Sequence, residues 1–131
     1  MYKLDSIKDY EMTRNLNLIN LKTNTLDSCF DDSEVTSFDN FSFMKVGETY
    51  DCKIYLFGEQ KFEGLEFKYI RDVIVGDRTL VEVSNDLEDI YFVEKNKIEI
   101  LKVGETFNFN YTRKDIIQVN DKIHPDFIIK N

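Results

Sequence analysis

Two copies of one seven-residue unit lead into alternating segments, and this arrangement constrains the fold more than any other feature of the sequence. Residues 44–50 read Met-Lys-Val-Gly-Glu-Thr-Tyr, and residues 101–107, 57 positions later, read Leu-Lys-Val-Gly-Glu-Thr-Phe. The glycine permits the positive φ of a tight turn, and threonine followed by an aromatic residue favours the start of a strand. Each unit is therefore predicted to deliver the chain into a β-strand, with Gly47 and Gly104 at positive φ.

Apolar and polar residues alternate in the segments that these units enter. A period of two places every second side chain on the same face of a strand. We therefore predict that the apolar positions of both segments share one core. These positions are Tyr50, Cys52, Ile54, Leu56, Phe107, Phe109 and Tyr111.

The amino-acid composition favours an all-β fold. The 131 residues include no Ala and no Trp, and the apolar set consists mainly of Ile, Val, Leu, Phe and Tyr. Alanine is the best helix former, whereas β-branched and aromatic residues suit a pleated, half-buried surface. We predict one mainly antiparallel β-domain with little helix, either a sandwich or a small barrel, with an OB- or SH3-like barrel favoured.

The pattern along the chain divides this single domain, residues 1–131, into two parts. Residues 1–43 are predicted to hold an N-terminal hairpin and an acidic loop, and residues 44–131 the core strands. Residues 49–57 form the strongest predicted strand. Residues 58–64, which are polar and contain two glycines, are expected to be a flexible connector.

The recurrence of the seven-residue unit has two explanations. One is duplication of an ancestral segment, and the other is separate use of a favourable strand-entry turn. The residues between the two copies do not match, which favours the second explanation. Two copies are also too few to bury the stacked core of a solenoid.

The chain is acidic, with 25 Asp and Glu against 17 Lys and Arg and a formal net charge of −8. Residues 23–43 and 79–94 concentrate acidic side chains and contain no Lys or Arg. Such a chain repels a phosphate backbone, so nucleic-acid binding is not expected. No stretch suits a signal peptide or a membrane span, which predicts a cytoplasmic protein.

Residues that carry catalysis or bind metals are few and poorly spaced. His124 is the only histidine, and Cys29 and Cys52 lack the paired spacing of a zinc site. The acids between Asp27 and Glu34 lack the alternation and central glycine of a calcium loop. Glycine-rich phosphate loops, nucleophile elbows and dinucleotide fingerprints are absent from the sequence. The sequence therefore predicts no enzyme, no cofactor and no metal.

The remaining hypothesis is a non-enzymatic binding protein that acts by surface complementarity. A negative face would steer the encounter with a basic protein partner, such as a toxin or a nucleic-acid enzyme. The use of Ile, Lys, Asn and Phe without Ala suggests an AT-rich genome. The most specific form of the hypothesis is thus an immunity or inhibitor (anti-defence) protein of a low-GC bacterium or its phage. The residues assigned to the acidic face are Asp31, Asp32, Glu34, Glu88 and Asp89.

Two alternatives remain open at this point: a small nucleic-acid-binding β-barrel, and a structural or accessory domain. Nucleic-acid binding would use an exposed aromatic strip of Tyr55 and Phe57, beside Lys53 on the same strand face. The sequence does not indicate the oligomeric state or the identity of a partner.

Overall fold

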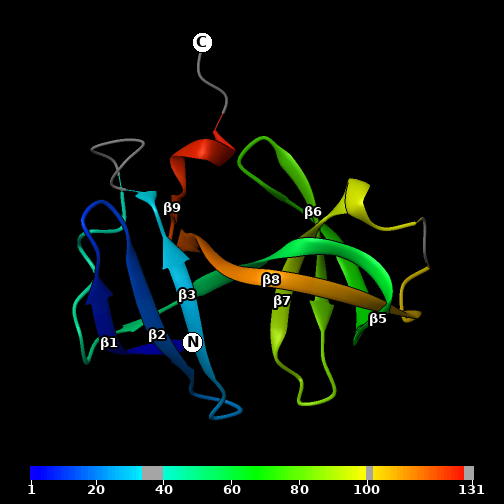
Figure 1. The fold of residues 1–131 in the computed structure, drawn as a ribbon, viewed down its shortest axis with the longest axis horizontal. Helices are drawn as coiled ribbons and strands as arrows, with labels where there is room; N and C mark the ends of the chain where they lie inside the picture. The colour runs from blue at the N-terminus through cyan, green and yellow to red at the C-terminus, as the bar shows by residue number, and fades with distance from the viewer. Residues whose placement is uncertain (34–39, 100–101, 129–131) are drawn as a thin grey trace.

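The computed structural model describes residues 1–33, 40–99 and 102–128, and its strands form one mixed sheet that is not closed (Figure 1). Strand accounts for 62% of the structure and helical turns for 6%, so the predicted all-β fold with little helix is confirmed. The strand order is β4-β1-β2-β3-β8-β5-β6-β7, and β9 pairs with β8. The sheet thus stays open, unlike the closed barrel that the sequence favoured. None of the described helical turns has the length and apolar character needed to cross a bilayer.

The strands and the short 3₁₀ turns have the following bounds. They are β1 (Tyr2–Asp9), β2 (Arg14–Asn20), β3 (Leu26–Asp31), β4 (Thr49–Tyr50), β5 (Cys52–Val75), β6 (Arg78–Ser84), β7 (Ile90–Glu94), η1 (Lys95–Lys97), β8 (Thr106–Val119), β9 (Lys122–Ile123) and η2 (Pro125–Phe127).

The first half of the sheet recurs in the second half with the same strand register. Leu4 pairs with Leu18 in the antiparallel ladder of β1 and β2, and Tyr69 pairs with Val83 in the ladder of β5 and β6, 65 residues later. Both ladders shift register directly after this pair. A β-bulge is a specific local feature of a strand pair and not a general property of sheets. Its recurrence at the same position therefore indicates that the two hairpins are structurally equivalent.

The turns of the two halves also match. The side-chain oxygens of Asn20 and Asn85 each accept a hydrogen bond from the backbone N–H two residues later, at 2.9 and 3.0 Å. Asn24 and Glu88, 64 residues apart, each have a positive φ, 65° and 66°. Positive φ is uncommon outside glycine, so its recurrence shows that the two hairpins close by related turns, although the β2–β3 turn is one residue longer: the N–H of Asn20 donates to the carbonyl of Thr25, and the N–H of Asn85 donates to that of Asp89.

The two seven-residue units dock in the same way. The N–H of Gly47 donates to the carbonyl of Leu4, and the N–H of Gly104 donates to the carbonyl of Tyr69, both at 2.8 Å. The φ angles of these glycines are 91° and 92°, which confirms the predicted turns. The unit therefore recurs because each copy clamps the first strand of its own half at the same residue.

We call residues 2–57 module 1 and residues 67–119 module 2. The last strand of each module crosses to the other: β5 pairs in parallel with β7 at Tyr55–Phe92, and β8 pairs in parallel with β3 at Phe30–Asp115. Strand β5 is 24 residues long because it ends module 1 and begins module 2. The recurring unit thus belongs to a repeated structural module, so the interpretation that only a turn recurs is wrong.

Residues 58–64 are not the flexible connector that the sequence predicted. They belong to β5, where Gly58 pairs with Tyr111 and Gln60 pairs with Phe109 before the register shifts to Leu65. Most of this stretch of β5 is exposed, so it lacks the apolar alternation that identifies a half-buried strand.

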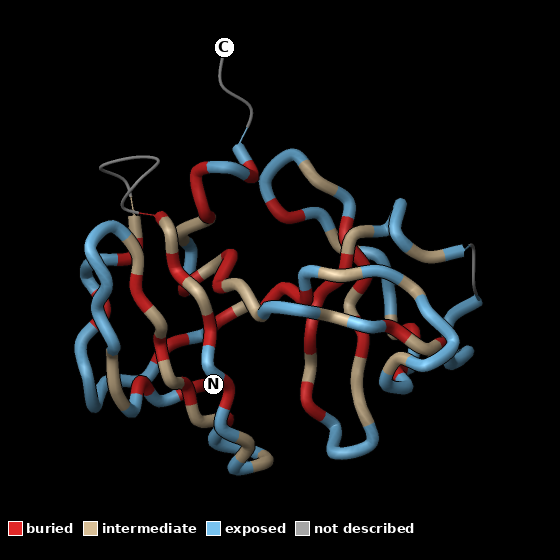
Figure 2. Tube along the Cα trace, viewed as in Figure 1, coloured by how far each residue is buried: buried red, intermediate tan, exposed pale blue. Residues whose placement is uncertain are grey.

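The predicted core residues lie together. Six of the seven belong to one buried cluster, and the seventh, Tyr111, packs against it. The N-terminal hairpin supplies Leu4, Leu16 and Leu18 to the same cluster. Buried and more exposed positions alternate along the strands, as Figure 2 shows. A smaller cluster lies on the other face of β5; its members are Tyr55, Val75, Leu80, Phe92, Ile117 and Phe127.

Candidate functional site

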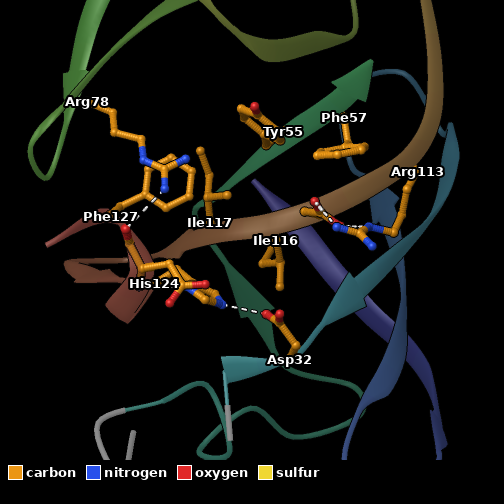
Figure 3. Close-up of a pocket in the computed structure, with 11 residues that line it drawn as sticks. Asp32, Tyr55, Phe57, Arg78, Arg113, Ile116, Ile117, His124 and Phe127 are labelled. Atoms are coloured by element: carbon orange, nitrogen blue, oxygen red, sulfur yellow. Dashed lines mark hydrogen bonds and ion pairs between the residues drawn. The ribbon is translucent and has the colours of Figure 1, made fainter. Parts of the chain in front are cut away.

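A pocket of about 170 Å³ lies where the two modules and the C-terminal segment meet, and we call it the seam pocket (Figure 3). It is lined by Asp32, Tyr55, Phe57, Arg78, Arg113, Asp115, Ile116, Ile117, His124, Asp126 and Phe127. Asp32 follows β3, Arg78 begins β6, and the remaining residues come from β5, β8 and the C-terminal segment. The crossing of β5 and β8 between the modules is therefore what builds this site.

The C-terminal segment, residues 122–128, is a strap across this junction. The backbone N–H of His124 donates to the carbonyl of Ile117 at 2.8 Å, and the N–H of Asp77 donates to the carbonyl of Phe127 at 2.7 Å. The ring of Phe127 meets the ring of Tyr55 edge-on, with centroids 5.9 Å apart. These bonds tie the strap to β8 and to the turn before β6, and they fix one wall of the pocket.

His124 is buried and pairs with Asp32 across the seam. Its Nε2 lies 2.7 Å from Oδ1 of Asp32, and its Nδ1 accepts a hydrogen bond from the backbone N–H of Asp126 at 3.1 Å. Because Nδ1 is an acceptor here, the proton of the neutral ring resides on Nε2, which donates to Asp32.

The side chains of Asp32, His124 and Asp126 are the candidate metal ligands in the described structure, with ligand atoms within 4.8 Å of one another. A histidine that binds a metal through Nε2 usually donates its Nδ1–H to an acceptor. In this pocket Nδ1 instead receives an N–H, so metal binding at Nε2 would require a doubly deprotonated ring. The geometry fits a hydrogen-bonded histidine better than a metal ligand, and the absence of a metal stays a prediction.

Arg113 is the most firmly held cation at the rim. Its guanidinium donates to both carboxylate oxygens of Asp115, at 2.6 and 3.1 Å. It also lies 4.6 Å from the ring centroid of Phe30 and 5.0 Å from that of Phe57. The hydrogen bonds to Asp115 raise the pKa of Arg113, and burial raises the pKa of Asp115 against the opposing effect of Arg113. The pair presents a fixed, stacked guanidinium.

Arg78 holds the opposite wall of the pocket. Its guanidinium lies 4.2 Å from the ring centroid of Phe127, within cation–π range, and its Nη1 donates to Glu94 at 3.1 Å. Burial raises the pKa of the nearby Tyr55 hydroxyl, so this phenol stays protonated at neutral pH. The pocket therefore combines two paired arginines, one hydrogen-bonded histidine and aromatic walls.

The structure brings only Asp32 of the predicted acidic face to this pocket. Asp31 is buried, and its carboxylate accepts a hydrogen bond from Nε of Arg14 at 2.8 Å. Asp89 is 1% exposed and accepts hydrogen bonds from hydroxyl and amide groups, including Thr25 at 2.8 Å. Two of the predicted docking charges are thus internal, and substituting them would affect the fold.

The other two residues of that face are Glu88 and Glu34. Glu88 is exposed, 3.8 Å from the ammonium of Lys22, and Glu34 lies outside the described residues. Figure 1 shows the end of β3 and the turn between β6 and β7 at opposite edges of the molecule. Asp31 and Asp32 therefore do not form one face with Glu88 and Asp89.

The predicted aromatic strip is also divided. Phe57 is 51% exposed, whereas Tyr55 is buried in the smaller cluster beneath the strap. The sequence did not assign Arg78 or His124 to a site, because the strap that brings them together is short and lacks a strand pattern. The apolar tail ending in Phe127 was the available signal that this segment packs on the body.

Neither cysteine lines the seam pocket, and we predict that both thiols are unreactive in the folded protein. Burial raises the pKa of Cys29 well above its usual range and that of Cys52 to about 12. The thiolate is the reactive form, so iodoacetamide at pH 8 should label neither residue until the chain is unfolded in urea. Mass spectrometry measures the labelling. Equal labelling rates with and without urea would contradict the prediction.

No protein-family model, curated protein or solved structure matches this chain.

Proposed function

We propose that this chain is a non-enzymatic binding protein whose contact surface is the rim of the seam pocket. The observation that carries the proposal is Arg113, held by two hydrogen bonds to Asp115 and within cation–π distance of the rings of Phe30 and Phe57. Arginine and aromatic side chains dominate the binding energy of protein interfaces. A side chain already fixed in the free protein loses little entropy on binding.

The charges around this rim favour a basic protein as the partner. Asp32 is partly exposed and Asp126 is exposed, and both line the seam pocket beside the aromatic walls. The whole chain carries a formal net charge of −8, which would accelerate the encounter with a basic surface. An inhibitor or immunity protein directed against a basic toxin or nucleic-acid enzyme is the specific class that we propose.

Two observations favour binding over catalysis and over nucleic-acid recognition. The residues that line the pocket include no Ser, Thr or Cys that His124 could activate as a nucleophile. Both arginines of the pocket are engaged by carboxylates, and only Phe57 of the aromatic strip is exposed. A single-stranded nucleic acid requires available cations and several stacking rings.

A photo-crosslinking experiment tests the proposal. Phe57 is replaced by p-benzoylphenylalanine in cells of the source organism, with the same replacement at Phe62 as the control. Phe62 is 94% exposed on the β5 segment away from the pocket. The expected result is a crosslink from position 57, absent from position 62, to a protein with a basic surface.

Affinity measurements on the purified partner complete the test. Phe57→Ala should weaken binding by at least about tenfold, which is 1.4 kcal/mol, whereas Phe62→Ala should leave the affinity unchanged. Raising the salt concentration should slow association. A crosslink to nucleic acid, or equal effects of the two substitutions, would contradict the proposal.

A further inference from the structure

The repeated modules differ sharply on their outer faces. In module 2 the outer face of β6 and β7 carries Leu80 and Phe92, which form a buried cluster with Phe127 of the strap. Tyr55, from the strand that crosses over from module 1, completes this cluster. The chain thus covers the outer face of module 2 with its own C-terminal segment.

The equivalent face of module 1 has no such cover among the described residues. The counterparts of Leu80, Phe92 and Tyr55 are Asn15, Ser28 and Thr112, identified from the register of the strand pairs and of the seven-residue unit. Ser28 and Thr112 are exposed, and Asn15 is half-buried. Polar side chains replace apolar ones where the covering segment is missing, which keeps this face hydrated in the free protein.

A groove of about 490 Å³ occupies this position, and we call it the open groove. It is lined by Asn15, Leu26, Ser28, Phe30, Tyr111, Thr112, Arg113 and Lys114. Leu26 is 59% exposed, although its counterpart in module 2, Ile90, packs against the covered cluster. The groove therefore keeps Leu26 as an exposed apolar contact point.

The edge of β3 along this groove is open as well. In the described ladders β3 pairs with β2 on one side, and with β8 on the other at Phe30–Asp115 alone. The backbone from Leu26 to Cys29 consequently has no ladder partner on the β8 side within the described structure. Unpaired strand edges bind extended polypeptide segments by adding a strand.

We propose that the open groove binds an extended segment of the partner polypeptide, which covers the outer face of module 1 as the strap covers that of module 2. This inference rests on the proposed function, because Arg113 lines both the seam pocket and the open groove and makes them one continuous surface. The backbone of the segment bonds to Asn15, Ser28, Thr112 and the β3 edge. One apolar side chain of the segment packs on Leu26 and Phe30.

The charges of the groove argue against the other occupants. Lys114 donates to the buried carboxylate of Asp27 at 2.5 Å, and Arg113 is engaged by Asp115, so a phosphate would meet no unpaired cation on the described groove wall. A second copy of this chain is not the occupant that we propose, because the strap of each copy already covers its own module 2.

Random dodecapeptides displayed on phage are the probe for this groove. Peptides selected on the full chain should shift the amide NMR signals of Asn15, Leu26, Ser28 and Thr112, and should bind in an extended conformation. Ser28→Lys should lower their affinity at least about tenfold by filling the groove with a charged side chain. The matched control, Ser42→Lys, changes an exposed residue outside the groove and should have no effect.

A second variant and a second readout make each outcome decisive. Thr112→Lys, on the other wall of the groove, should lower the peptide affinity as Ser28→Lys does. The test then remains valid even if Ser28→Lys disturbs the fold. The inference would be overturned if no peptides were enriched, or if the peptides bound Ser28→Lys and Ser42→Lys equally well. It would also be overturned if the bound peptides were helical, or if the amide signals shifted at residues outside the groove. If Phe57→Ala weakens binding of the partner while Ser28→Lys and Thr112→Lys do not, the groove proposal fails and the proposed function stands. If Phe57→Ala has no effect, the proposed function itself fails.

Discussion

Replacing Asp31 by Ala is expected to lower the free energy of unfolding by about 3–5 kcal/mol, because the guanidinium of Arg14 is left buried without its ion partner. Both side chains are almost fully enclosed, and their Nε–Oδ2 distance is 2.8 Å. The same carboxylate accepts a hydrogen bond from the N–H of Ser33 at 2.9 Å, which is also lost. Urea denaturation followed by linear extrapolation measures the change.

Two controls separate the buried pair from a general effect of charge. Glu88→Ala removes an exposed acid and should change the stability by less than about 0.5 kcal/mol. The double variant Arg14→Met with Asp31→Leu removes both charges and should cost less than Asp31→Ala alone, because no unpaired ion remains. A loss below about 1 kcal/mol for Asp31→Ala would show that solvent reaches the guanidinium.

The sequence could not reveal that its acidic windows are partly internal. Asp27 accepts a hydrogen bond from the hydroxyl of Tyr91, 64 residues away, and pairs with Lys114, 87 residues away. Burial of a carboxylate depends on such partners, which come from β7 and β8, strands far from Asp27 in the sequence. Local composition shows only that the windows are acidic.

Strand positions were more accessible to prediction than the arrangement of the modules. Alternation identified the buried faces that carry Ile54 and Phe109, and the glycines at 47 and 104 identified the turns, because both are local properties. The repetition of the whole module lies in strand register, which the diverged sequences do not display. The same divergence distinguishes the outer faces of the two modules. Phe92 and Ser28 occupy equivalent positions, but only Phe92 is covered by the strap.

Phe109→Ala is expected to lower the free energy of unfolding by about 3–5 kcal/mol, because the ring is fully buried and its removal leaves a cavity in the core. The ring also meets that of Phe107 edge-on, with centroids 6.3 Å apart. The equivalent residue of module 1 is Cys52, 57 positions earlier, so Cys52→Ala is the matched control. It removes a single sulfur atom and should cost only about 1 kcal/mol.

The denaturation curves of Asp31→Ala and Phe109→Ala also test whether the two modules unfold as one unit. The module 1 end of β5 forms ladders with β7 and β8, and β8 also pairs with β3, so unfolding one module removes ladder partners of the other. Asp31→Ala in module 1 and Phe109→Ala in module 2 should therefore shift a single transition, with coincident fluorescence and circular dichroism curves. Two separate transitions, each moved by one substitution only, would show that the crossing strands do not couple the halves. A loss below about 1 kcal/mol for Phe109→Ala would show that the ring is not enclosed by the core.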